Sequence, residues 1–194
     1  MTMHRFCPLS IVLLSLVVFS ESEAQWVQPY GGPFFYTVYA IAVSDTHLFA
    51  GMYGGRGVCS STDNGVTWYS LYTGLTSRNV RSLISSGPNL FVGTDSGVFR
   101  STNKGLEWTV ANAGLTAPYV YSFAVIGTDL FAGTYDNGVF RSTDDGASWV
   151  HTSFLDTVVH ALAVSGTNLF AGTEIGVFRS TNNGTSWTKV NTGL

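Results

Sequence analysis

An all-β fold is predicted, a β-propeller of about four four-stranded blades in an open arc or partial propeller, because one unit returns four times along the 194-residue chain. A tryptophan recurs in steps of 40, 41 and 38 residues, at Trp68, Trp108, Trp149 and Trp187. The string LFAG or LFVG recurs in phase, and each unit holds four short runs of β-branched and aromatic residues between glycine- and asparagine-rich turns. Helical periodicity is absent after the N-terminal segment; a β-solenoid, whose rungs are shorter, is the alternative.

The first two dozen residues have a different composition. A basic start precedes the apolar run Ile11–Phe19, and Ser22 and Ala24 are small residues in front of Gln25. The run is too short to span a bilayer comfortably, so residues 1–24 are predicted to be a signal peptide, with a single-pass anchor as the alternative. The expected location is secreted, periplasmic or cell-surface, with no membrane span after cleavage. Cys59 then remains as the only cysteine, which excludes an internal disulfide.

The strand count of the predicted propeller is uneven. Trp26 precedes Ile41 by 15 residues, as the later tryptophans precede the next inner strand, so residues 25–33 are predicted to be an orphan outer strand. The blades are expected over residues 34–75, 76–115, 116–155 and 156–194. The last blade also ends on a fourth strand of its own. The count predicts an arc that is a fragment of a longer propeller or half of a dimeric ring, with self-association through its open edges.

An eight-residue string joins the third strand of each unit to the fourth, and the first copy is STDNGVTW. Its third position is always Asp or Asn, whose side chain is expected to accept a hydrogen bond from the backbone two residues on. The fifth is always glycine, as a turn with positive φ requires, and the indole is expected to bury its face against a neighbouring strand. The structural positions are Ser61, Asp63, Gly65 and Trp68; Ser101, Asn103, Gly105 and Trp108; Ser142, Asp144, Gly146 and Trp149; and Ser180, Asn182, Gly184 and Trp187.

This string resembles the Asp-box or BNR repeat, Ser-x-Asp-x-Gly-x-Thr-Trp. The first copy matches every position, and the others depart at Asn103 and Glu107, at Ser148, and at Asn182 and Ser186. The resemblance is closest to exported bacterial BNR-repeat proteins and implies a propeller of the sialidase-like, sortilin-like and photosystem assembly-factor-like superfamily. In those proteins the box is a peripheral hairpin away from any active site. A calcium site at Asp144–Asp145 is the alternative to a turn.

Differences between the units select a candidate ligand site on the face opposite the boxes. The inner strands begin VYAI, VRSL, VYSF and VHAL, and their second position varies among polar side chains: Tyr39, Arg81, Tyr121 and His160. These side chains are expected to point toward one channel mouth, with Arg81 holding an anion. Loop residues on the same face complete the candidate ligand-binding set: Tyr53, Arg56, Tyr119, Tyr135 and Asp136. The alternative is that the four strand residues are hydrogen-bonded spacers between blades.

The composition excludes several classes of function. A formal charge of −3 with 11% charged residues indicates no nucleic-acid partner. No catalytic, metal or cofactor motif is found, so no catalytic residue, metal or cofactor is expected. The leading interpretation is a secreted non-catalytic propeller that binds an extracellular protein or glycan. The alternatives are a sialidase-like glycoside hydrolase, or a fragment of one, and a structural module of a cell-surface protein; the Arg-Ile-Pro element of sialidases is missing.

Overall fold

The computed structural model describes residues 37–154 and 157–194. The predicted signal peptide (1–24), the predicted orphan strand (25–33) and residues 34–36 lie outside the described residues. The described part of the chain consists of sixteen strands joined by turns and loops. It contains no helix that is long and apolar enough to cross a membrane.

The strands form four sheets, each of four consecutive antiparallel strands. The first contains β1 (Thr37–Ser44), β2 (His47–Tyr53), β3 (Gly57–Ser61) and β4 (Tyr69–Leu71). The second contains β5 (Val80–Ser86), β6 (Asn89–Thr94), β7 (Gly97–Ser101) and β8 (Thr109–Val110). The third contains β9 (Val120–Ile126), β10 (Asp129–Thr134), β11 (Val139–Ser142) and β12 (Val150–His151). The fourth contains β13 (Val159–Ser165), β14 (Asn168–Thr173), β15 (Gly176–Ser180) and β16 (Thr188–Lys189).

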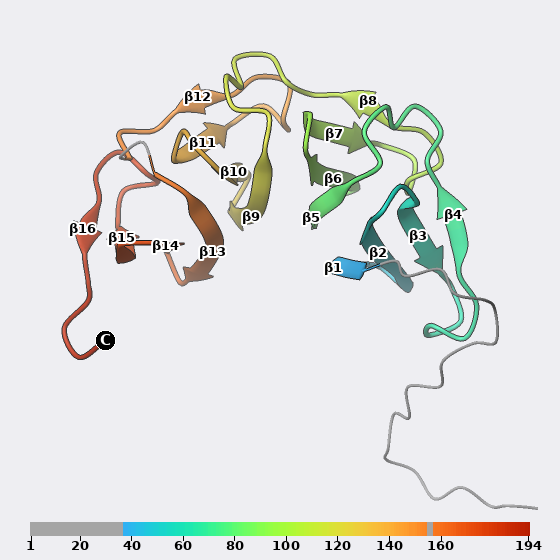
Figure 1. Cartoon of the computed structure of the whole chain (residues 1–194), viewed down its shortest axis with the longest axis horizontal. Helices are drawn as coiled ribbons and strands as arrows, with labels where there is room; N and C mark the ends of the chain where they lie inside the picture. Colours follow the sequence, from blue (N-terminus) through green and yellow to red (C-terminus); the bar gives the residue numbers. More distant parts are fainter. Residues whose placement is uncertain (1–36, 155–156) are drawn as a thin grey trace, which may run out of the picture. The chain divides into compact units, whose positions relative to one another are not determined.

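The sheets are the blades of a partial β-propeller. The first strand of each sheet contacts the first strand of the next, so β1, β5, β9 and β13 follow one another along the inner side of an arc (Figure 1). The short fourth strands, β4, β8, β12 and β16, lie on the outer side (Figure 1). The predicted all-β fold with four-stranded blades in an open arc is confirmed.

Neighbouring blades meet through one recurring contact between a valine and a glycine. The valine begins the inner strand of one blade, and the glycine belongs to the LFAG or LFVG string of the blade before. A Cβ placed on Gly133 would lie 2.6 Å from Cγ1 of Val159, so only glycine fits there. The equivalent distances are 2.5 Å for Gly51 and Val80 and 2.7 Å for Gly93 and Val120. We call these three pairs the valine–glycine contacts.

Apolar side chains fill the space between blades in three clusters, one at each junction. The phenylalanine of the LFAG or LFVG string is fully buried at each junction, as Phe49, Phe91 and Phe131. Trp108 and Trp149 of the eight-residue strings complete the first and second clusters and are each 2% exposed. Each blade is therefore stabilised mainly by the blade next to it.

The eight-residue string is a hairpin turn held by its own side chains. In the first copy, Ser61 Oγ accepts from the Gly65 backbone N–H at 2.8 Å and donates to Asp63 Oδ1 at 2.7 Å. The Asp63 carboxylate accepts from the backbone N–H of Thr67 at 2.9 Å. The predicted hydrogen bond from the backbone two residues after the aspartate is wrong. The Gly65 N–H donates to the Ser61 hydroxyl instead, and the Asp63 carboxylate accepts from Thr67, four residues on. Gly65 has the expected positive φ of 88°, and Asn64 also has a positive φ, 55°.

The other three copies repeat this bonding. Gly105, Gly146 and Gly184 each donate to the serine four residues before, at 2.8 to 2.9 Å. In the second and fourth copies the amide oxygens of Asn103 and Asn182 replace the carboxylate and accept at the same distance, 2.9 Å. Because the carboxylate oxygens of Asp144 are hydrogen-bonded to serines within its own turn, the geometry favours the turn over a calcium site at this position.

The two aspartates of these turns should contribute to acid sensitivity. Hydrogen bonds from Thr67 lower the pKa of Asp63 to about 2, and those from Ser148 lower the pKa of Asp144 to about 2. Each depressed pKa gives stability that is complete above about pH 4 and is lost as the pH falls toward 2, because the unfolded carboxyls take up protons first. Urea unfolding of the Asp63→Asn, Asp144→Asn double variant should therefore be less sensitive to acid than that of the wild type. If the free energy of unfolding falls by the same amount in the two proteins between pH 6 and about pH 2, this assignment is wrong.

Candidate ligand-binding face

The four polar residues of the inner strands all occupy β-bulges. In β5 the residues on either side of Arg81 pair with adjacent residues of β6, Thr94 and Gly93, so Arg81 itself has no strand partner. The same shift of register leaves Tyr39, Tyr121 and His160 unpaired in β1, β9 and β13. A bulge leaves one residue outside the ladder and re-aims its side chain. The repeated bulge thus gives each blade one variable side chain directly after the valine of its inner strand.

The structure brings these bulge residues into one series of ring and cation contacts. The Tyr39 and Tyr53 rings meet edge to face with centroids 5.4 Å apart. Arg81 Cζ lies 5.1 Å from the Tyr53 ring centroid and 4.9 Å from that of Tyr121. Tyr121 in turn stacks on His160, with centroids 6.3 Å apart and an interplanar angle of 26°. We call Tyr39, Tyr53, Arg81, Tyr121 and His160 the aromatic series; it crosses all four blades.

Two further tyrosines extend the series at the third blade. The Tyr135 ring lies 5.5 Å from the Tyr121 ring and 6.1 Å from the Tyr119 ring, centroid to centroid. The backbone N–H of Tyr135 donates to the Tyr119 carbonyl at 3.0 Å, which fixes the two loops to each other. Tyr119 and Tyr135 are exposed, so this group presents ring faces to solvent.

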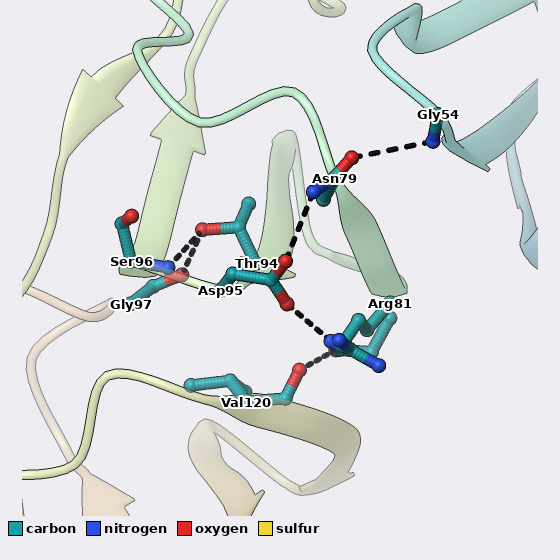
Figure 2. Close-up of polar contacts among 9 residues, drawn as sticks. Gly54, Asn79, Arg81, Thr94, Asp95, Ser96, Gly97 and Val120 are labelled. Carbon is teal, nitrogen blue, oxygen red and sulfur yellow. Dashed lines mark hydrogen bonds and ion pairs between the residues drawn. The ribbon is translucent and has the colours of Figure 1, made fainter.

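A polar network holds Arg81 in place and balances its charge. Figure 2 shows Asp95 between Asn79 and Arg81. Arg81 Nε donates to one carboxylate oxygen of Asp95, and Asn79 Nδ2 donates to the other at 3.0 Å. Asn79 Oδ1 accepts from the backbone N–H of Gly54 at 3.2 Å, which ties the network to the first blade. The guanidinium is thereby fixed between the Tyr53 and Tyr121 rings.

The electrostatics of Arg81 follow from this pairing. Partial burial lowers the pKa of Arg81, but the hydrogen bond and charge of Asp95, together with the neighbouring Tyr121 and Tyr53, raise its pKa above the ordinary value. The group is therefore a permanent cation beside a carboxylate. The expected role of Arg81 as an anion holder is weakened, because Asp95 already occupies its Nε–H and offsets its charge. At the other end, His160 Nε2 lies 3.8 Å from Glu174 Oε1.

The remaining sequence-predicted residues lie on loops. Arg56 and Asp136 are exposed on the loops that follow β2 and β10. Sequence reasoning places Asn79, Asp95 and Glu174 on the same loop face but does not include them among the candidate ligand-binding residues. The sequence does carry a signal for Asp95 and Glu174, because each directly follows the threonine of an LFVGT or LFAGT string. That threonine pairs with the valine directly before the bulge of the same blade, which brings the acidic residue close to the bulge.

Sequence comparison places the chain in a family. Residues 93–194, more than half of the 194 residues, match the model of the DUF6242 beta propeller domain. The chain belongs to this family. Membership of a propeller family confirms the fold that the resemblance to Asp-box propellers predicted. No curated protein is significantly similar to the chain in sequence.

Several solved structures are similar in fold to this family member. An ancestral GH74 enzyme is 21% identical with a TM-score of 0.68, over 79% of this chain and 24% of that chain. The extracellular domain of a putative one-component system from B. thetaiotaomicron is 19% identical with a TM-score of 0.69, over 84% of this chain and 23% of that one. YCF48 bound to D1 peptide is 12% identical with a TM-score of 0.60, over 84% of this chain and 56% of that chain. The chain spans about a quarter of the length of the first two proteins, and at these identities the likeness concerns the fold alone.

Proposed function

We propose that this chain is an exported, non-catalytic module that binds a neutral glycan through the aromatic series. The observation that carries the proposal is the unbroken run of Tyr39, Tyr53, Arg81, Tyr121 and His160 across four blades. Tyrosine provides rigid contact area and a hydroxyl that donates and accepts. Ring faces carry negative charge, which attracts the polarised C–H groups on the face of a sugar. An array of such rings suits an extended chain of sugar units.

The charge balance of the face favours a neutral ligand over an anionic one. Asp95 offsets the charge of Arg81, and Glu174 lies near His160. Guanidinium N–H groups of Arg81 beyond the Nε–H that binds Asp95 are donors to sugar hydroxyls. The predicted signal peptide agrees with an extracellular ligand.

Binding to a glycan array, followed by titration calorimetry with the selected oligosaccharide, tests this proposal. Tyr121→Ala should weaken the affinity about tenfold or more, because it removes the ring that contacts Arg81, Tyr135 and His160. Tyr69→Ala is the matched control, since Tyr69 is an exposed tyrosine on the outer strand β4, and it should bind normally.

Two results would contradict the proposal. The first is an array on which no glycan is bound above background, which would instead favour a peptide or protein ligand. The second is an affinity that falls steeply as salt is raised from about 0.05 to 0.5 M, since exposed charge pairs are screened over that range and a neutral ligand should be insensitive to it.

A further inference from the structure

The first blade exposes a surface that every later blade buries. Val38, the second residue of β1, directly precedes the bulge, as Val80 does in the next blade. Val38 is nevertheless 46% exposed, whereas Val80 is 0% exposed. Ile41 is 58% exposed, whereas the equivalent Leu83 is 8% exposed. In the later blades these side chains pack on the preceding blade. The flank of β1 is thus one half of a valine–glycine contact without its other half.

The fourth blade exposes the complementary surface. Gly172 holds the glycine position of its LFAG string, but the nearest atoms to a Cβ placed there belong to Ala161 at 3.8 Å, and no valine fills the space. Phe170, beside it, is partly exposed, while its equivalents in the three other blades are fully buried. The flank of β14 is therefore the glycine half of the same contact.

A second pair of positions, nearer the outer side of the arc, repeats this complementarity. A Cβ placed on Gly74 or Gly114 would lie 2.1 or 2.2 Å from the carbonyl oxygen of the next blade's tryptophan. Gly193 holds the equivalent position in the last blade, and no atom lies within 4 Å of a Cβ placed there. The first blade correspondingly leaves Trp68 partly exposed, although Trp108 and Trp149 are buried.

We propose that the chain pairs with a second copy of itself, with Val38 and Trp68 of each copy docking on Gly172 and Gly193 of the other. The occupant is a second copy because each flank is built like one half of the three junctions within the chain, and the two halves stand at opposite ends of the arc (Figure 1). Each contact joins different surfaces of the two copies, and two identical junctions related by a twofold axis close the two chains into a ring. The resulting ring of about eight blades lies within the known range for propellers.

Closure would also extend the ligand-binding face. Within the chain, each junction brings bulge residues of neighbouring blades into the aromatic series, as with Tyr121 and His160. A junction of the same kind would set His160 of one copy beside the first-blade bulge residue, Tyr39, of the other. This pairing stands independently of the glycan proposal, because it rests on the blade flanks and not on the ligand.

Sedimentation velocity of the full chain at about 50 μM tests the pairing, because most of the chain is paired at that concentration if the dissociation constant is about 1 μM or lower. The wild type should sediment as a species of twice the chain mass. Val38→Asp and Gly172→Leu should each sediment as monomers with unchanged circular dichroism. Gly172 has no positive φ and has space for a side chain, so Gly172→Leu should fold. Val110→Asp, at an exposed valine on the outer strand β8, is the control and should remain paired.

An equimolar mixture of Val38→Asp and Gly172→Leu gives a sharper result. In a mixed pair, Val38 of the Gly172→Leu variant can dock on Gly172 of the Val38→Asp variant, so one junction remains intact. Species of twice the chain mass should therefore reappear. A wild type that sediments as a monomer would overturn the proposal and would leave residues 25–33 or further blades of a longer chain as the cover of these flanks. A paired species unaffected by both substitutions would also overturn it.

Discussion

Gly133→Ala should lower the free energy of unfolding by about 1–3 kcal/mol, the usual cost of overpacking a filled core. The added methyl would lie 2.5 Å from Ser122 Oγ and 2.6 Å from Val159 Cγ1. Val159 cannot move easily, since it is fully buried between two blades and its strand is paired on the sheet. Urea unfolding followed by tryptophan fluorescence measures the loss.

Gly172→Ala is the matched control at the same position of the last blade. Its methyl would meet only Ala161 at an ordinary 3.8 Å, so the substitution should be neutral or should stabilise by up to about 1 kcal/mol, as alanine does over glycine inside a strand. Both variants are best measured in a Val38→Asp background, in which pairing of copies does not contribute. Equal losses at Gly133 and Gly172 would show that the glycine is required within its own sheet, not for the fit between blades.

Trp149→Ala should cost about 3–5 kcal/mol, as expected for a large aromatic side chain removed from a core. Trp149 is 2% exposed, and its indole N–H donates to the Ala111 carbonyl of the preceding blade at 2.8 Å. The substitution leaves a cavity and a carbonyl that loses its indole partner at the junction of two blades. The free energy of unfolding in urea measures this cost directly.

Trp68→Ala, at the same position of the first blade and measured in the unpaired Val38→Asp background, should cost only about 1–2 kcal/mol, because Trp68 buries less apolar area. Trp68 is partly exposed, and its indole N–H donates within its own turn, to the Gly65 carbonyl at 3.0 Å. Losses of similar size at Trp68 and Trp149 would contradict the assignment of the box tryptophan to the junction between blades.

The repeat made the fold predictable from the sequence. The tryptophan spacing and the LFAG strings fixed four strands per blade, because residues that recur in phase must serve the same packing in each copy. The open edges also followed from the strand count. The hydrogen bonds within the eight-residue string did not follow from the sequence. Ser61 accepts from the Gly65 N–H, so Asp63 accepts from the Thr67 N–H, and the choice between two nearby donors depends on turn geometry.

The candidate site was predictable as a column of residues but not as a set of contacts. The variation at Tyr39, Arg81, Tyr121 and His160 in an otherwise repeated strand marked the column. The bulge beneath it leaves no sequence signature, since the register shifts without an inserted glycine or proline. The contacts of Arg81 with Tyr53 and Tyr121 depend on how closely blades pack, which the valine–glycine contacts set and which periodicity alone does not report.

Hydrogen–deuterium exchange of the full chain with and without its selected oligosaccharide tests the ligand-binding face most directly. Bound ligand should slow exchange at the starts of β1, β5, β9 and β13 and in the loops that follow β2 and β10. Exchange should be unchanged in the four eight-residue turns, which lie between the third and fourth strands of each blade. Protection confined to those turns, with none at the inner-strand bulges, would contradict the account.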